Sequence, residues 1–137
     1  MIIGRFIRDF NKYFTSLVLL ILAVFSFYFL FTTGEKIFVY KVGGWEPIDR
    51  VPIGIYMIMD GFTAIVLCII NLIGFLSAFY SISYIKRYTA ENYFYSLFCL
   101  MVAGMNGVVL SGDLFNIFVF LEISVISSYA LAIPDSL

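Results

Sequence analysis

One acidic residue, Glu122, lies inside an apolar run near the C-terminal end of the sequence. It stands eight residues beyond Leu114, so a membrane-spanning helix that begins there would hold it close to the middle of the bilayer. A carboxylate at that depth costs roughly several kcal/mol unless it is paired, hydrated or protonated. Apolar surroundings raise the proton affinity of such a group and a nearby cation lowers it, so movement between the two takes up and releases a proton. Glu122 is therefore the main candidate for ion translocation.

The neighbours of Glu122 indicate what kind of partner it needs. At about 100° per residue its helix face is aromatic and branched, whereas Ser124, Ser127 and Ser128 lie on the other side. The apolar runs contain no lysine or arginine at the same depth, so a pairing cation must come from another polypeptide. The alternative is a structural glutamate, permanently protonated or hydrogen-bonded, that fixes the helix register. The predicted face consists of Phe115, Phe118, Val119, Val125, Ile126 and Tyr129.

Four further polar residues flank or interrupt the apolar runs. Asp60 and Asp113 are weaker candidates for ion translocation, because both stand at predicted helix margins where water and backbone amides solvate a carboxylate. Asp113 directly precedes a predicted helix, which favours N-capping, and capping or interfacial solvation also explains Asp60. Asn71 and Asn106 lie within predicted helices, where hydrogen bonding between helices accounts for them.

The composition identifies an integral membrane protein. Of 137 residues, 63% are hydrophobic and only 12% are charged, which is more apolar surface than a soluble domain of this size can bury. The net charge is −1 and no histidine is present, so nothing indicates a nucleic-acid partner or a metal site. Cys68 and Cys99 fall inside apolar runs and are expected to pack there. We expect no cofactor in this chain, since it lacks cofactor ligands, a phosphate-binding loop and a nucleophile–base set.

The sequence predicts an all-α membrane fold of about four transmembrane helices, and these helices position the polar residues named above. A helix needs about 20 apolar residues to cross a hydrocarbon core of about 30 Å. The stretch 34–52 carries charges and glycines and is predicted to be an extracytoplasmic loop, with a possible short hairpin from the alternation at Ile37–Tyr40. Residues 1–137 thus form a single membrane domain, with helices predicted at 13–33, 55–81, 93–110 and 114–133.

Two features of the predicted helices bear on their packing. Only Ser111, Gly112 and Asp113 separate the last two helices, so these must be antiparallel neighbours. The third helix has small residues four positions apart, which indicates a ridge where another helix approaches closely, and its glycines are also able to loosen it locally. The residues of the ridge are Cys99, Ala103, Gly107 and Ser111. The two glycines of this helix are Gly104 and Gly107.

The basic residues near the helix ends favour one orientation in the cell membrane. With both termini in the cytoplasm, five basic residues lie inside and three outside, in accordance with the excess of lysine and arginine on the cytoplasmic side. The inner set is Arg5, Arg8, Lys12, Lys86 and Arg87, and the outer set is Lys36, Lys41 and Arg50.

A longer motif resembles a known family. The run 100–131, which contains GDLFN at 112–116 and EIS at 122–124, is similar to the signature of the antiporter-like subunits. These occur in Mrp-type sodium/proton antiporters, in membrane-bound hydrogenases and sulfane reductases, and in respiratory complex I. The D-type Mrp subunits are the nearest in pattern. GGWEP at 43–47 and DGFTA at 60–64 also resemble stretches upstream of the signature.

The resemblance implies a role for Glu122 and a set of partners. In that family the matching glutamate belongs to the ion-translocation path and pairs with a lysine on a later helix. Family members have about fourteen helices in two inverted bundles, whereas this sequence covers neither the family's first helix nor the helices after the glutamate. The resemblance therefore implies a split subunit, or a relic kept within a larger complex, whose other membrane subunits supply the lysine-bearing helix.

Three functions remain open from the sequence. The first is a part of a proton- or sodium-translocating module in a multisubunit complex, coupled to an antiporter or to a redox enzyme whose chemistry belongs to other subunits. The second is a structural or assembly subunit of such a complex that does not conduct ions. The third is a small four-helix cation exporter, which also depends on a membrane glutamate, although the loop-to-helix signature argues against it.

Overall fold

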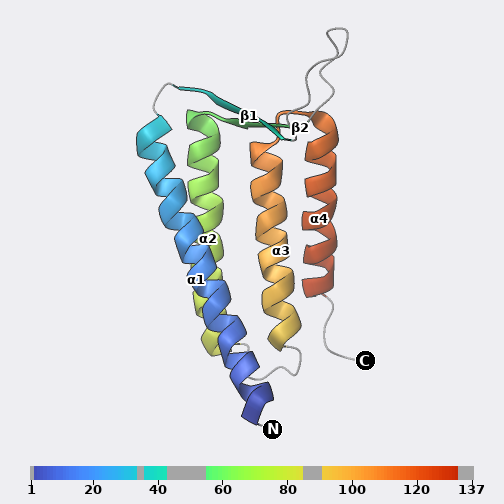
Figure 1. Cartoon of the computed structure of the whole chain (residues 1–137). Coiled ribbons are helices and arrows are strands. Elements are labelled where there is room, and N and C mark those ends of the chain that lie inside the picture. The colour runs from blue at the N-terminus through green and yellow to red at the C-terminus, as the bar shows by residue number, and fades with distance from the viewer. Residues whose placement is uncertain (1, 34–35, 43–54, 85–90, 133–137) are drawn as a thin grey trace.

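A computed structural model describes residues 2–33, 36–42, 55–84 and 91–132, and it contains a bundle of four helices capped by two short strands (Figure 1). The helices run alternately up and down, so the start of α1 and the end of α4 both lie on the side opposite the strands. The elements are α1 (Ile2–Thr33), β1 (Phe38–Val42), β2 (Ile55–Met59), α2 (Gly61–Tyr84), α3 (Glu91–Leu110) and α4 (Leu114–Ala132).

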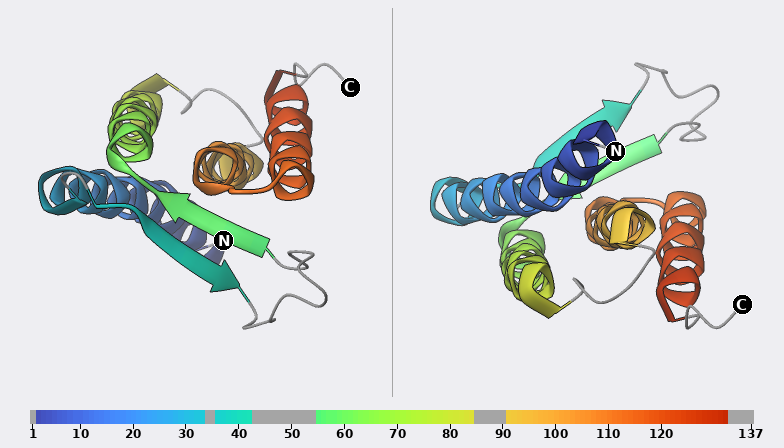
Figure 2. Two further views of the ribbon diagram at one scale, coloured as in Figure 1. Left: turned by 90° about the horizontal axis from the view of Figure 1, so that it is seen from above. Right: turned by 90° about the horizontal axis from the view of Figure 1, so that it is seen from below.

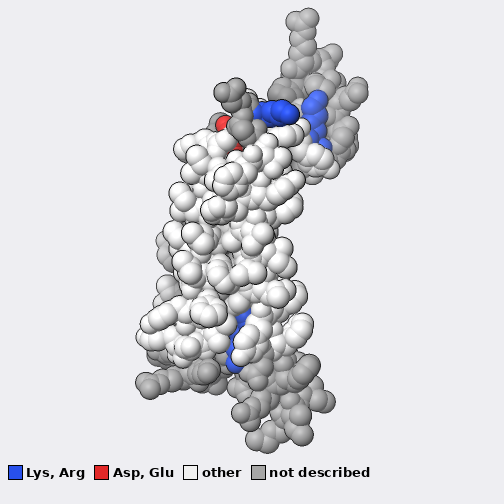
Figure 3. Space-filling view, turned by 90° about the vertical axis from the view of Figure 1, so that its left-hand side faces the viewer, with Lys and Arg blue, Asp and Glu red and all other residues white. Residues whose placement is uncertain are grey.

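The four predicted membrane helices are confirmed. Each contains a segment that is long and apolar enough to cross a bilayer, and most of the side chains in these segments face outward. Figure 3 shows one face of the surface that results, on which charged side chains appear near the two ends of the molecule, with an uncharged band between them. The spans are Phe10–Thr32, Gly61–Tyr84, Tyr93–Leu110 and Leu114–Ala132.

The prediction that the second helix begins at residue 55 is wrong. Residues Ile55–Met59 form strand β2, which pairs antiparallel with β1 from Phe38↔Met59 to Val42↔Ile55. These five residues are apolar, so they extend the apolar run, but β-branched and aromatic side chains also favour a strand. The helix begins only after Asp60, which caps it. The alternation at Ile37–Tyr40 predicted a short hairpin within the loop, and residues Phe38–Val42 do form strand β1, but its partner among the described residues is β2, which follows the loop. Most of the loop 34–52 lies outside the described residues.

The helices are arranged as two closely packed pairs, α1 with α2 and α3 with α4. Seen along the bundle, α3 lies between α4 and the other pair, which leaves α4 at one edge (Figure 2). The buried apolar core joins α1, α2 and α3 through Leu19, Ala78, Phe98 and Val102. Consequently α4 is the helix with the smallest buried share in its membrane span.

A chain of polar side chains links α1, α2 and α3 within the membrane span. The Asn106 amide donates to Asn71 Oδ1 at 2.8 Å, the Asn71 amide donates to Ser26 Oγ at 2.9 Å, and Ser26 donates to the carbonyl of Leu22 at 2.8 Å. In hydrocarbon such groups need protein partners, because no water is available to replace them. The predicted role of Asn71 and Asn106 in hydrogen bonding between helices is thus confirmed.

Candidate functional site

Glu122 lies near the middle of α4 and its side chain is exposed. The large side chains around it are exposed as well, so a broad apolar face of this helix has no cover from the described part of the chain. In a bilayer this face contacts either lipid or protein beyond the described residues. The exposed residues of the face are Phe115, Phe118, Val119, Ile126 and Tyr129, all of which the helical periodicity placed beside Glu122.

The opposite side of α4 explains this orientation. Phe120 and Ser124 contact α3 at its two glycines, and Asn116 and Ser127 are buried in the same contact region. Phe120 and Ser124 are each two residues from Glu122, which is about 200° around a helix. The carboxyl group is therefore directed away from α3 and out of the bundle.

Glu122 forms no hydrogen bond or ion pair with any residue that the structure describes. The basic residues within the described ranges lie in the first turns of α1 (Arg5, Arg8 and Lys12) or at the end of the bundle that β1 and β2 cover, called the strand end below (Lys36 and Lys41). A carboxylate in the middle of an apolar helix needs compensation that this part of the chain does not provide.

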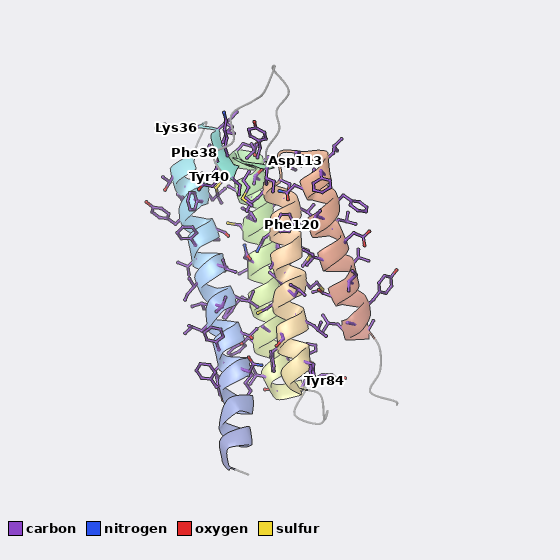
Figure 4. The ribbon with its side chains drawn as sticks, turned by 45° about the vertical axis from the view of Figure 1, so that its right-hand side comes forward. Lys36, Phe38, Tyr40, Tyr84, Asp113 and Phe120 are labelled. Atoms are coloured by element: carbon purple, nitrogen blue, oxygen red, sulfur yellow. The ribbon has the colours of Figure 1, made fainter. Side chains whose placement is uncertain are left out.

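Asp113 joins two elements at the strand end of the bundle. Its Oδ1 accepts a 2.7 Å hydrogen bond from the backbone N–H of Asn116 and so caps α4. Its Oδ2 accepts a longer bond, 3.4 Å, from the backbone N–H of Tyr56 in β2. The structure thus confirms the capping role and adds an anchor for the strand, which the sequence did not predict. Figure 4 shows Asp113 at the α3–α4 turn, beneath the strands.

The same turn holds β2 through the backbone. The N–H of Gly112 donates to the carbonyl of Tyr56 at 2.7 Å, and Ser111 forms a bridge with Met57. A Cβ atom on Gly112 would stand 2.7 Å from Ile58 Cδ1 and 3.2 Å from the carbonyl oxygen of Tyr56, so any larger residue would require the Ile58 side chain to shift. No periodicity in the sequence indicates this contact, because the paired residues are about 55 positions apart.

Asp60 caps α2 in the same manner as Asp113 caps α4. Its Oδ1 accepts a 2.7 Å hydrogen bond from the backbone N–H of Thr63, and its own carbonyl accepts from Ala64. The bonds from the Thr63 backbone and hydroxyl favour the charged carboxylate and hold the pKa of Asp60 below its ordinary value of 3.8. The predicted capping role is confirmed, while a role in ion translocation stays a prediction for both aspartates.

The lowered pKa of Asp60 predicts a pH-dependent start of α2. A carboxyl with a depressed folded pKa stabilises the fold above pH 3.8, and that stabilisation is lost as the pH falls through the lower folded pKa. The protection of the Thr63 and Ala64 amides against hydrogen exchange, expressed relative to the intrinsic exchange rate at each pH, should therefore fall below pH 3.8. Asp60→Asn retains a cap without a titrating group, so in this variant the fall in protection should be absent; an equal fall in both proteins would contradict the assignment.

Among the residues that the structure describes, no three His, Cys, Asp or Glu side chains lie together as a metal site. Cys68 is buried and Cys99 partly buried, and both are free thiols. The absence of a resident cofactor stays a prediction.

The sequence matches known proteins along most of its length. Residues 45–95 match the family model described as NADH-Ubiquinone oxidoreductase (complex I), chain 5 N-terminus. The chain is also 40% identical over 98 residues to the D subunit of a probable K(+)/H(+) antiporter from Rhizobium meliloti (strain 1021). That alignment covers 72% of this chain and 17% of the relative. The chain resembles the antiporter-like membrane subunits.

The fold of this antiporter-like chain is found in two solved complexes. One is the Mrp complex from Dietzia sp. DQ12-45-1b, with a TM-score of 0.80 and 27% identity over 90% of this chain and 22% of that chain. The other is the membrane-bound sulfane sulfur reductase, an archaeal respiratory membrane complex, with a TM-score of 0.78 and 30% identity over 96% and 28% of the two chains. The antiporter-like chain thus spans less than a third of each protein that it matches here.

Proposed function

We propose that this chain is part of a proton- or sodium-translocating, antiporter-like module in a multisubunit membrane complex, with Glu122 as its protonatable residue. The observation that carries the proposal is the exposure of Glu122 on an apolar, bilayer-length helix with no partner among the described residues. A carboxyl group so placed must either stay protonated or receive a charge or water from a neighbour, and a proton carrier alternates between these two situations. The similarity to subunits of an antiporter and of a respiratory complex supports the same function.

The neighbour is proposed to be a lysine-bearing helix of another membrane subunit. The uncovered face of α4 gives such a helix an apolar surface to pack on, and Glu122 gives it a charge to pair with. An ammonium group that approaches and withdraws would stabilise and destabilise the carboxylate in turn. Neither Lys36 nor Lys41 meets this need, because both lie at the strand end of the molecule.

Glu122→Gln in the assembled complex tests the proposal. Glutamine keeps the size and hydrogen-bonding capacity of the side chain but does not titrate, so cation-coupled transport should be lost while the complex still assembles. The second candidate function, a structural subunit that does not conduct ions, predicts unchanged transport. The apolar face around Glu122 serves either function, and only the carboxyl group distinguishes them.

We also propose that both termini lie in the cytoplasm, which places the strand end outside the cell membrane. The distribution of basic residues supports this orientation, although Lys86, Arg87 and Arg50 lie outside the described residues. In a variant without Cys68 and Cys99, a cysteine at exposed Lys36 should react with an impermeant maleimide in intact cells. A cysteine at exposed Ser83 should react only after permeabilisation. The reverse pattern would invert the topology.

A further inference from the structure

The contact between α3 and α4 depends on two glycines of α3. A Cβ atom on Gly104 would stand 2.9 Å from the backbone nitrogen of Ser124 and 3.0 Å from the carbonyl oxygen of Phe120. A Cβ atom on Gly107 would overlap the ring of Phe120, whose side chain extends from α4 towards α3 (Figure 4). Any side chain at either glycine would therefore force α4 or its phenylalanine to move.

We infer that Gly104 and Gly107 are positioning residues that set the rotation of α4 and thereby direct Glu122 towards its partner. A ring seated over a glycine restricts both rotation and sliding of the helix that carries it. Phe120 and Ser124 point towards α3, and Glu122 lies between them in sequence on the opposite side of the helix. The two glycines thus act on the carboxyl group through the body of α4, without touching it.

The two glycines act in chemically different ways, which makes the inference testable. The obstacle at Gly107 is a side chain, so shortening Phe120 should remove it. The obstacle at Gly104 is the α4 backbone, which no side-chain truncation relieves. Gly74 is a matched control, because it is also a buried helical glycine but its added Cβ would meet only Val102 at 3.4 Å, an ordinary contact.

The experiment compares Gly74→Ala, Gly104→Ala, Gly107→Ala and Phe120→Ala in the full complex, together with double variants that combine Phe120→Ala with each α3 glycine substitution. Transport is measured per amount of assembled complex, as is the pH at which transport is half-maximal. Gly107→Ala should lower transport about tenfold and move the pH midpoint, since overpacking shifts the helix and changes the surroundings of Glu122. Phe120→Ala should rescue Gly107→Ala but not Gly104→Ala, and Gly74→Ala should match the unmodified complex.

The inference is overturned if Gly107→Ala lowers assembly but leaves transport per complex and the pH midpoint unchanged. It is also overturned if Phe120→Ala fails to rescue either the assembly or the transport of Gly107→Ala. The effect on transport rests on the proposed function of Glu122, so Glu122→Gln is measured alongside. Normal transport in Glu122→Gln rejects the proposed function, whereas loss of transport there with normal transport in Gly107→Ala rejects only the positioning role.

Discussion

Replacing Glu122 with glutamine is expected to lower cation-coupled transport by at least about 100-fold, the lower end of what a positioned proton donor and acceptor contributes. The reason is the loss of the only carboxyl group in the described span of α4, since the other polar side chains there are amides, hydroxyls and the phenol of Tyr129. Transport is measured as ion flux in vesicles that contain the assembled complex. Glu122→Asp keeps a titrating carboxyl on a shorter side chain and should retain part of the flux.

The matched control for this prediction is Ser128→Ala. Ser128 is also an exposed polar residue of α4, but its hydroxyl donates to the carbonyl of Val125 at 2.8 Å within the same helix. Its removal should leave transport unchanged. If Glu122→Gln also leaves transport unchanged at equal amounts of complex, Glu122 is not a proton carrier and the chain is better described as a structural subunit.

Replacing Asp113 with alanine is expected to destabilise the strand end of the bundle by about 1–2 kcal/mol. Alanine removes the N-cap of α4, which is worth about 0.5–2 kcal/mol, together with the acceptor for the Tyr56 N–H. The expected result is faster amide hydrogen exchange at Asn116, Ile117 and Tyr56. The midpoint temperature of thermal unfolding of the assembled complex should also be lower.

Asp113→Asn separates capping from ion translocation at this position. Asparagine caps a helix about as well as aspartate, through its one side-chain oxygen. Its amide nitrogen cannot accept from the Tyr56 N–H as Oδ2 of Asp113 does, so we expect a stability between those of the unmodified protein and Asp113→Ala, with near-normal transport. Loss of transport at this intermediate stability would show instead that the carboxyl of Asp113 carries ions, as the weaker alternative from the sequence proposes.

Most of the helical fold is predictable from the sequence because its cause is local. A bilayer requires long apolar helices, and an apolar run of about 20 residues shows where each one lies. Periodicity grouped Glu122 with aromatic and branched residues, and the structure finds most of that face exposed. Of the serines that it placed on the other side, Ser127 is buried but Ser128 is exposed. The composition did not distinguish strand β2 from helix α2, because Ile55–Met59 are as apolar as the helix that follows.

The contacts between distant segments were predictable only in part. The ridge of small residues in α3 correctly indicated close helix approach at Gly107, yet Ala103 of the same ridge is exposed and the nearest α4 backbone lies at Gly104. The expected loosening at these glycines is absent from the described helix, as α3 runs unbroken from Glu91 to Leu110. The hydrogen bond between the Tyr56 N–H and Asp113 forms only because the α3–α4 turn packs against β2. The spacing of residues within either segment does not indicate this packing.

The most direct test of the role of Glu122 is an experimental map of the assembled complex at a resolution that shows side chains. We expect another polypeptide to cover the face of α4 formed by Phe115, Phe118, Val119, Ile126 and Tyr129, with an ammonium group or ordered water within hydrogen-bonding distance of the Glu122 carboxyl. A map in which that carboxyl contacts only lipid acyl chains would contradict the proposed role in ion translocation.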